Sequence, residues 1–455
     1  MSVLHNIFFF IVAIGVLVTF HEFGHYWVAR KMGVRVLRFS VGFGKPLFTW
    51  VRTVGKDEIE YVIAAIPLGG YVKMLDEREG DVKEEDRKFA FNNKPLPQRA
   101  AIVAAGPVFN FILAIIFYWF IFVLGVTVDR PLIGPPQANS IADIAGFSVK
   151  DEILKVQDVE IKSWNAFRLA ILEQGLDGGS LDILVKDKDG TRYTRSMELG
   201  ETKLLDDEGD ILTKLGFSQW WPDLPPEIGG VIDGGAAEKA GMQAGDIIRL
   251  VNNEPVEDWR TIVEMIKSSN EKTMHFVIER SGENKEIIVT PEVSEINGER
   301  RKYVGIYQKY PEGLKDELQV RLEYNVFEAL PLALKKTWDM SSLTLRVLWK
   351  MVAGEASLKN ISGPVTIATY AGVTANIGLT TFIGFLAVIS VSLGVLNLLP
   401  IPILDGGHLF YYLIEAIKGS PVSEAFEMRG QQIGIALLAM LMFIALFNDL
   451  QRLLQ

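Results

Sequence analysis

The sequence of 455 residues contains no cysteine, so the fold uses neither disulfide bonds nor thiolate metal ligands. It contains only five histidines, which leaves few imidazoles for a metal site. It has no block of basic residues and a formal net charge of -10, which argues against a protein that binds nucleic acid. Without cysteine, the sequence leaves the redox compartment undecided.

The first apolar run lacks two features of a cleaved signal peptide. No Lys or Arg precedes this run, and no small-residue cleavage site follows it. We therefore expect residues 7–28 to form a retained transmembrane helix.

Apolar runs are nevertheless frequent in the sequence. It is 49% hydrophobic and 22% charged, which fits membrane helices joined to sizeable soluble domains. A helix needs about 20 apolar residues to span a bilayer. We expect four spans, at residues 7–28, within 100–128, at 380–399 and at 432–448. Residues 331–352 are interrupted by charges and predict an amphipathic helix that lies in the membrane interface.

The basic residues predict the orientation in the membrane. Arg30, Lys31, Arg35 and Arg38 follow the first span directly, whereas no basic residue precedes it. Because basic loops remain in the cytoplasm, we place the segment between spans one and two inside. The long segment between spans two and three then lies outside, and spans one and three both end at the cytoplasmic side.

The first span ends in the motif His-Glu-Phe-Gly-His, residues 21–25. Residues four apart share one face of a helix, so His21 and His25 can offer imidazole nitrogens to one metal ion. Glu22 lies roughly 100° further around the helix, where a carboxylate can take the proton of an attacking water. A chance spacing of two interfacial histidines is the alternative, but ionisable residues inside a membrane are costly and usually functional.

A catalytic zinc site needs three protein ligands and one open position. Of the other histidines, His5 is expected at the opposite membrane face, His275 on a strand, and His408 near the right depth. We favour Asp405, because Pro400 and Pro402 break the third span and free the backbone near its inner end. We expect Asp405 on non-helical chain, followed by a tight turn at Gly406-Gly407.

The segment between spans one and two contains two strand-like stretches, 34–41 and 59–66. Turns at 42–44 and 67–71 follow them. Such strands predict a small sheet at the membrane face whose edge accepts an extended peptide by strand addition. An ordinary cytoplasmic hairpin is an equally good interpretation of the same pattern.

The external segment contains an internal repeat. The stretch from Ile141 to Trp164 matches that from Ala236 to Trp259 at a constant offset of 95 residues, which indicates a duplicated domain. The second copy resembles the PDZ family, whose members bind peptides at a sheet edge. In the first copy Lys150 stands where the second has Gly245. Peptide binding and a purely steric or scaffolding role remain equally open for both copies.

The two ligand motifs together resemble those of the site-2 protease family of intramembrane zinc metalloproteases. They are HExxH on the first span and Asn-x-x-Pro-x-Pro-x-x-Asp-Gly at 397–406. Gly-Pro-Val-Phe-Asn at 106–110 and Ser-Gly-Pro at 362–364 also match stretches common in bacterial members. The resemblance covers essentially the whole chain.

The resemblance implies one catalytic zinc ion held by His21, His25 and Asp405, with Glu22 as general base. It also implies that Asn397 holds the substrate backbone near the metal, although an interhelical hydrogen bond would explain this residue as well. The candidate substrate-binding residues are Asn397, Gly42, Phe43, Gly44, Gly70 and Tyr71.

The resemblance further implies regulated intramembrane proteolysis in a bacterial inner membrane. The expected substrates are single-span membrane proteins, namely an anti-sigma factor already trimmed by another protease, and remnant signal peptides. The PDZ pair would exclude substrates with bulky external domains.

We therefore expect a polytopic α-helical membrane protein with four transmembrane helices, a small membrane-associated β-sheet and two extracytoplasmic PDZ domains. The expected boundaries are 1–28 for the first span, 29–98 for the cytoplasmic segment, 99–128 for the second span, 129–220 and 221–312 for the PDZ domains, 313–375 for a linker with the amphipathic helix, 376–407 for the third span, and 408–455 for a loop and the fourth span.

Two other functions compete with proteolysis. A membrane-anchored PDZ scaffold with a structural metal would need no base at Glu22. A transporter that uses the intramembrane His and Asp as a relay would be expected to have more spans and no Glu beside the first ligand.

Overall fold

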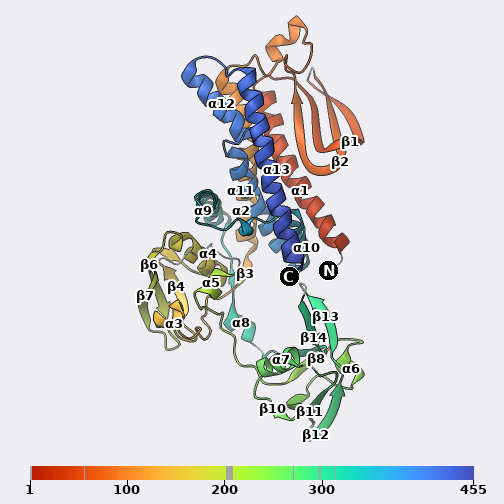
Figure 1. Cartoon of the computed structure of the whole chain (residues 1–455), viewed down its shortest axis with the longest axis vertical. Helices are drawn as coiled ribbons and strands as arrows, with labels where there is room; N and C mark the ends of the chain where they lie inside the picture. The colour runs from red at the N-terminus through yellow and green to blue at the C-terminus, as the bar shows by residue number, and fades with distance from the viewer. Residues whose placement is uncertain are drawn as a thin grey trace. The chain divides into compact units, whose positions relative to one another are not determined.

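The computed structural model describes residues 3–55, 57–200, 209–269, 271–296, 299–311 and 313–454 (Figure 1). The chain divides into two compact units. The first contains most of the chain up to Val126 together with Arg321–Asp449, and the second contains most of Thr127–Val320. The residues expected to bind the metal all belong to the first unit.

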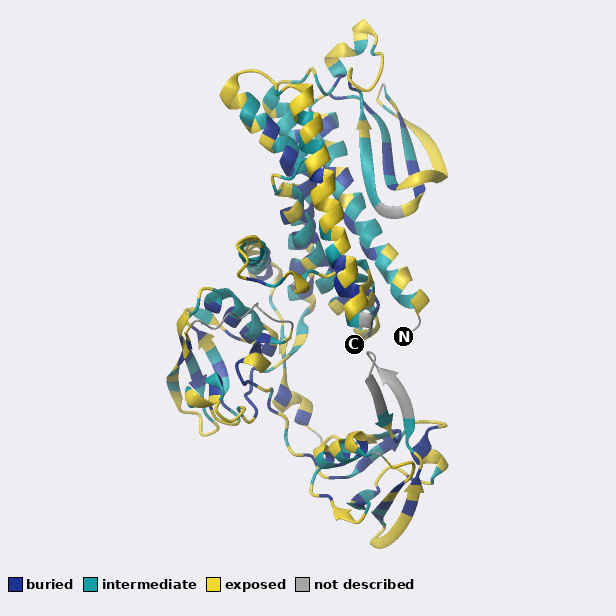
Figure 2. Ribbon diagram, in the orientation of Figure 1, coloured by how far each residue is buried: buried dark blue, intermediate teal, exposed yellow. Residues whose placement is uncertain are grey.

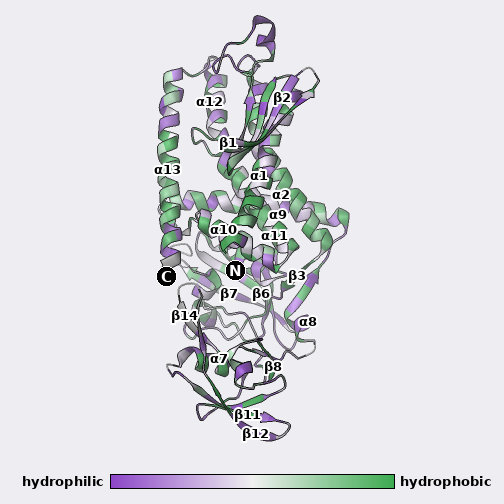
Figure 3. Cartoon of the chain, turned by 90° about the vertical axis from the view of Figure 1, so that its right-hand side faces the viewer, coloured by the Kyte–Doolittle hydropathy of each residue, from purple (hydrophilic) through white to green (hydrophobic). Residues whose placement is uncertain are grey.

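Four helices in the described ranges are long and apolar enough to span a membrane, which confirms the predicted number. They are α1 (Val3–Lys31), α2 (Leu96–Leu124), α11 (Leu379–Leu398) and α13 (Glu424–Leu454). Figure 3 shows their hydrophobic residues in green. Much of the surface of α13 is exposed and apolar, including Ile433 and Phe443 (Figure 2). A surface of this kind is suited to lipid.

Helix α2 is the centre of the first unit. It contacts α1, α11, α9 and α12. Two of these neighbours are α9 (Val326–Val352) and α12 (Asp405–Lys418), and α10 (Pro364–Ile377) packs against α1 and α11. Helices α1 and α2 approach closely at Gly24, where a β-carbon would lie 2.5 Å from the carbonyl oxygen of Ala105. The absence of a side chain on Gly24 therefore sets the separation of the two helices.

Strands β1 (Val36–Val54) and β2 (Asp57–Met74) form a small antiparallel sheet beside α1. Each strand bends, so the sheet consists of four segments. Their order across the sheet is 48–54, 57–63, 36–41 and 70–74. The sequence predicted the two inner segments and missed both outer ones. In the described part of the chain, segment 70–74 has a pairing partner on one side only, so it is a free edge.

The amphipathic helix expected at 331–352 is present as α9 and is one turn longer at its start. Asn325 caps this helix by accepting hydrogen bonds from the backbone of Phe327 and Glu328, and Glu328 completes a capping box. Trp338 and Trp349 are 74% and 72% exposed, as suits a helix that lies in the membrane interface.

Two further helices, α10 and α12, occupy segments that the sequence assigned to linker and loop. The first begins directly after Gly363 at Pro364, a favourable first helical residue. Its backbone donors are satisfied from another helix: Asp449 of α13 accepts hydrogen bonds from the amides of Gly363, Val365 and Thr366 at 2.8–3.2 Å. A long-range cap of this kind leaves no local sequence signal.

The second unit contains the predicted repeat: the first five elements of the two copies begin 95 residues apart, and the sixth elements begin 91 residues apart. The first copy comprises α3 (Ile141–Ile144), β4 (Glu152–Val156), β5 (Val159–Glu160), α4 (Trp164–Gly175), β6 (Gly179–Lys186) and β7 (Arg192–Gly200). The second comprises α6 (Ala236–Lys239), β9 (Ile247–Val251), β10 (Glu254–Pro255), α7 (Trp259–Ser268), β11 (Met274–Arg280) and β12 (Glu283–Val289). The sheet orders, β5-β4-β6-β7 and β10-β9-β11-β12, are identical.

The remaining elements of the described chain are short. They are β3 (Val126–Asp129), α5 (Ile211–Lys214), β8 (Ile228–Val231), β13 (Glu292–Ile296), β14 (Glu299–Tyr303), β15 (Ile306–Gln308), α8 (Leu314–Leu318) and β16 (Gln319–Leu322), with 3-10 turns at Glu84–Phe89 and Leu358–Asn360.

Lys150, the one departure from the repeat that the sequence revealed, keeps the backbone shape of its counterpart. Its φ is +68°, and that of Gly245 is +89°. A left-handed lysine costs roughly 1–2 kcal/mol. Its ammonium group lies 4.1 Å from the ring centroid of Trp220 and 3.1 Å from a carboxylate oxygen of Glu317. These contacts offset part of that cost.

The cap of α10 generates a prediction about stability. We expect Asp449→Ala to lower the free energy of unfolding by about 1–3 kcal/mol, because buried backbone donors lose their acceptor. Thermal and denaturant unfolding of the detergent-solubilised protein measures this loss. The control is Asp339→Ala, which removes an exposed i,i+4 pair with Lys335 and should cost less than about 1 kcal/mol. Equal effects of the two variants would contradict the capping role.

Candidate metal centre

The two histidines of the HEFGH motif lie one turn apart on α1 and point to the same side. Their Nε2 atoms are 3.2 Å apart, and their ring centroids are 4.9 Å apart. Both side chains are largely buried, with 14% and 12% of their surface exposed. The i,i+4 spacing therefore produces the juxtaposition that the sequence predicted.

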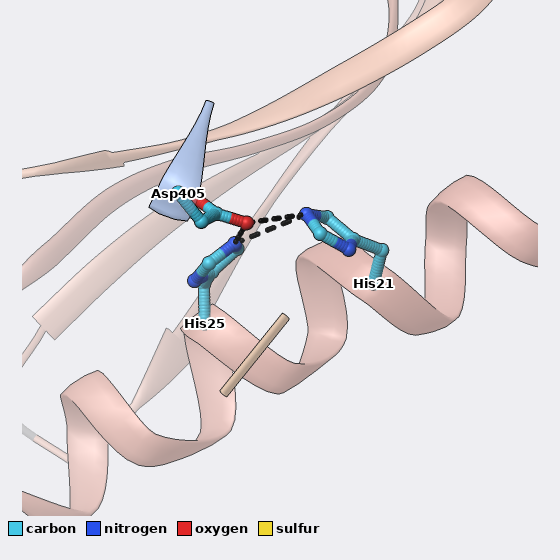
Figure 4. A group of neighbouring side chains, drawn as sticks. All are labelled: His21, His25 and Asp405. Atoms are coloured by element: carbon cyan, nitrogen blue, oxygen red, sulfur yellow. Dashed lines mark hydrogen bonds and ion pairs between the residues drawn. The ribbon is translucent and has the colours of Figure 1, made fainter. Parts of the chain in front are cut away.

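Asp405 completes the cluster from a different part of the chain (Figure 4). Its Oδ2 atom lies 3.2 Å from Nε2 of His21 and 3.5 Å from Nε2 of His25. The chain around it differs from the prediction, because Asp405 is the first residue of helix α12 rather than part of a non-helical segment.

The physical reason for this difference lies in Gly406 and Gly407. The sequence predicted a tight reversal of the chain at these two glycines. They instead lie in the first helical turn of α12 and pack against the chain that precedes it. A β-carbon on Gly406 would overlap the backbone of Leu398, and one on Gly407 would lie 2.7 Å from Cα of Pro402. The reversal occurs earlier, where Ile403 has a φ of +87°. A β-branched residue rarely adopts this conformation, so the connection before Asp405 is strained.

The cluster fits a zinc ion by an independent criterion. Ligand atoms of a tetrahedral zinc at about 2.0–2.1 Å lie roughly 3.3 Å from one another. The three distances between Nε2 of His21, Nε2 of His25 and Oδ2 of Asp405 are 3.2, 3.2 and 3.5 Å. In addition, Oδ2 of Asp405 is buried and has no hydrogen-bond donor among the described residues. A cation at the centre would satisfy all three atoms.

Glu22 lies beside this cluster and is only 9% exposed. The sheet covers it closely, because a β-carbon on Gly70 would lie 2.9 Å from Cγ of Glu22 and 2.7 Å from the carbonyl oxygen of Ser40. A side chain at position 70 would therefore push the sheet away from α1. The glycine lets the free edge of the sheet reach the carboxylate.

A cavity of about 670 Å³ opens over the cluster. The predicted residues that line it are His21, Glu22, His25, Gly70, Tyr71, Asn397 and Asp405. Gly42, Phe43 and Gly44, which the sequence also proposed for substrate binding, are absent from this lining. Phe43 stacks instead on the ring of Tyr71, with the ring centroids 6.3 Å apart.

Charged residues surround the part of the cavity beyond the cluster, where Arg38, Lys73 and Arg78 contribute to the lining. Burial alone would raise the pKa of Asp76, but Arg78 donates hydrogen bonds to it and holds that pKa below its usual value. His408 also lines the cavity, and burial lowers the pKa of its imidazole. In the described ranges, the group of side chains that could hold a metal ion contains Asp405 and not His408.

Sequence reasoning missed the contribution of α2 to this site. Gly106 faces both imidazoles: a β-carbon there would lie 2.7 Å from Cε1 of His21 and would overlap Nε2 of His25. The backbone carbonyl of Ile102 lies 2.9 Å from Nδ1 of His25, and the side chain of Asn110 lies 3.1 Å from Nδ1 of His21. In the sequence, Gly-Pro-Val-Phe-Asn at 106–110 is recognisable as a stretch shared with the family, but this resemblance gives its residues no role.

The position of Gly106 predicts the effect of a single methyl group. We expect Gly106→Ala to weaken Zn²⁺ binding at least about tenfold, because the added carbon displaces both imidazoles from their positions. Competition with a chromophoric chelator measures the affinity. Gly15→Ala is the matched control on a membrane helix, because a β-carbon there has no neighbour within 4 Å. Unchanged zinc affinity in Gly106→Ala would show that the two rings lie elsewhere.

Known proteins are similar to this chain over nearly its whole length. The family model described as Peptidase family M50 matches residues 9–441. The chain is 45% identical to the "Regulator of sigma-E protease RseP" of Escherichia coli over 453 residues, which cover all of both chains. It is 40% identical to a "Putative zinc metalloprotease" of Vibrio cholerae over 457 residues, and 38% identical to the "Regulator of sigma E protease" of Haemophilus influenzae over 454 residues. These alignments cover at least 99% of this chain and 100% of each relative.

These matches decide between the competing functions. They favour a metalloprotease over a scaffold or a transporter, and they confirm the resemblance drawn from the paired motifs. The chain belongs to peptidase family M50, the site-2 protease family of zinc-dependent metalloproteases.

Proposed function

We propose that this chain cleaves the transmembrane segments of single-span membrane proteins. The observation that carries the proposal is the cluster of His21, His25 and Asp405, located within a unit of apolar helices and adjoining the buried Glu22. A hydrolase whose reactive centre lies among membrane helices is suited to a substrate that is itself in the membrane. We assign one catalytic zinc ion to this cluster.

In the proposed mechanism, His21, His25 and Asp405 would hold the zinc ion. When bound there, zinc would polarise the scissile carbonyl and make water a stronger nucleophile. Glu22 accepts the proton of the attacking water and delivers it to the leaving amine. Its burial beneath Gly70 keeps bulk water away from the carboxylate and keeps it at the metal side of the cavity. Asn397, at the cavity wall, orients the substrate backbone.

A helical substrate must unwind before its carbonyl can be attacked, because its backbone groups are paired within the helix. The free sheet edge at 70–74 lines the cavity along its whole length. We propose that an extended stretch of substrate pairs with this edge. Gly70 and Tyr71 then contact the substrate directly, whereas Gly42, Phe43 and Gly44 support the edge from behind.

The basic residues after α1 favour a cytoplasmic position for the active site and an outside position for residues 129–312. We propose that the bacterial inner membrane contains the four spans. We assign the two repeats, 129–220 and 221–312, to PDZ domains of the periplasm. Their identical sheet orders support one duplicated domain. In this position they exclude substrates with bulky external domains, and their sheet edges offer sites for peptides.

We propose two classes of substrate. The names of the Escherichia coli and Haemophilus influenzae relatives, which refer to the regulation of sigma-E, support an anti-sigma factor trimmed beforehand by another protease. Cleavage would release its cytoplasmic part and start a response to envelope stress. Remnant signal peptides are the second class, since they are short, single transmembrane segments without an external domain.

The role of Glu22 is tested by replacing its carboxylate with an amide. We expect Glu22→Gln to retain zinc and fold but to cleave a defined transmembrane peptide about 10²–10⁴-fold more slowly, the usual contribution of a general base. Zinc content by atomic absorption and cleavage by mass spectrometry measure the two effects. Asp405→Ala is the complementary variant and should lose both zinc and activity. Cleavage at the wild-type rate in Glu22→Gln would overturn the assignment of the base.

Strand addition at the 70–74 edge predicts a periodic response to substrate modification. Alternate residues of an added strand direct their N–H groups to the edge, so N-methylation at successive positions should raise KM at every second one. We expect about a two- to tenfold rise at those positions, since one hydrogen bond contributes about 0.5–1.5 kcal/mol. The neighbouring N-methylated positions are internal controls. A uniform response along the peptide would argue against strand pairing.

A further inference from the structure

The stripe of α2 formed by Ile102, Gly106 and Asn110 lies against the imidazole pair, and the catalytic roles above leave it unexplained. These residues are four apart and therefore share one face of the helix. Ile102 contacts the ring of His25, Gly106 faces both rings, and Asn110 contacts the ring of His21. The face thus provides each imidazole with one polar contact at the nitrogen that points away from Asp405.

For His25, this contact fixes which ring nitrogen carries the hydrogen. The carbonyl oxygen of Ile102 lies 2.9 Å from Nδ1. A carbonyl can only accept a hydrogen bond, so Nδ1 of the neutral ring donates. Nε2 then presents a lone pair toward Asp405, as a metal ligand must.

For His21, the choice depends on the orientation of an amide. The amide nitrogen of Asn110 lies 3.1 Å from Nδ1 of His21. If this nitrogen donated, the ring hydrogen would sit on Nε2 and point into the metal site. A half-turn of the amide exchanges its nitrogen and oxygen with little change in shape. In that orientation the oxygen accepts the hydrogen of Nδ1 and leaves Nε2 free.

The surroundings of Asn110 support a role beyond packing. The residue has no exposed surface, and its Oδ1 atom has no hydrogen-bond partner among the described residues. A buried amide oxygen without a hydrogen-bond donor is unfavourable. Ser390 of α11 donates a hydrogen bond of 2.7 Å to the backbone carbonyl of Asn110, which anchors this turn of α2. The side chain is thereby held at the ring of His21.

We propose that Asn110 is a positioning residue of the metal site. Its amide oxygen accepts the hydrogen of Nδ1 of His21 and so keeps Nε2 free for the metal, as the carbonyl of Ile102 does for His25. This inference rests on the proposed ligand set. This role explains the Gly-x-x-x-Asn spacing of α2, because Gly106 leaves room for the two imidazole rings and Asn110 supplies the acceptor that orients the ring of His21.

The test compares zinc affinity among variants of the full-length protein in detergent, by competition with a chromophoric chelator. Asn110→Leu has a similar size but no acceptor, and we expect it to bind zinc about 10–100-fold more weakly. Asn110→Asp retains an acceptor and should stay within about threefold of wild type. Gly15→Ala is the control, because a β-carbon there has no neighbour within 4 Å, and it should leave zinc affinity unchanged. Asn110→Ala replaces the leucine variant if leucine prevents folding.

A second comparison distinguishes a lost orientation of the His21 ring from general damage to the fold. In a His21→Ala background, Asn110→Leu should change zinc affinity by less than about twofold, because the ring that it orients is absent. Wild-type affinity in Asn110→Leu, equal losses in the Leu and Asp variants, or a persistent loss in the His21→Ala background would each overturn the inference. Wild-type zinc affinity in His21→Ala itself would instead overturn the proposed ligand set.

Discussion

The repulsion among three buried electron-rich atoms is the constraint on which the first unit depends. Two imidazole nitrogens and a carboxylate oxygen lie 3.2–3.5 Å from one another, on side chains that are only 12–19% exposed. Such an arrangement is unfavourable unless a cation lies at its centre. The close approach of α1 and α2 at Gly24, the space left by Gly106 and the strained turn at Ile403 all bring these atoms together.

The sheet contributes to the same site through a second close approach. Gly70 allows the free edge at 70–74 to lie against Glu22, so one wall of the cavity is a strand and the other is the metal cluster. An extended peptide on that edge would place its carbonyls beside the metal and the base at once. The cavity thus has a free strand edge beside the cluster of His21, His25 and Asp405, as the proposed cleavage of an unwound substrate helix requires.

The local spacing of HEFGH was sufficient to predict the imidazole pair, and the order of the spans was sufficient to select Asp405 as its partner. Both rest on rules of helix period and membrane depth. The sequence did not predict α12, because Gly406-Gly407 is typical of a turn and only close packing against Leu398 and Pro402 makes it helical. It missed both outer sheet segments. Segment 70–74 begins at Gly70, which is a weak strand signal, whereas 48–54 contains neither glycine nor proline and was overlooked although it is rich in β-branched and aromatic residues. It also missed Asn110, whose contact spans 89 residues of sequence.

The most direct test of this account is the location of the metal itself. A crystal of the zinc-loaded protein, measured at the zinc absorption edge, gives an anomalous difference map that needs no assumption about ligands. The account predicts one strong peak per chain, about 2.0–2.2 Å from Nε2 of His21, Nε2 of His25 and a carboxylate oxygen of Asp405. A strong peak elsewhere, or none at this cluster in protein shown to contain zinc, would contradict it.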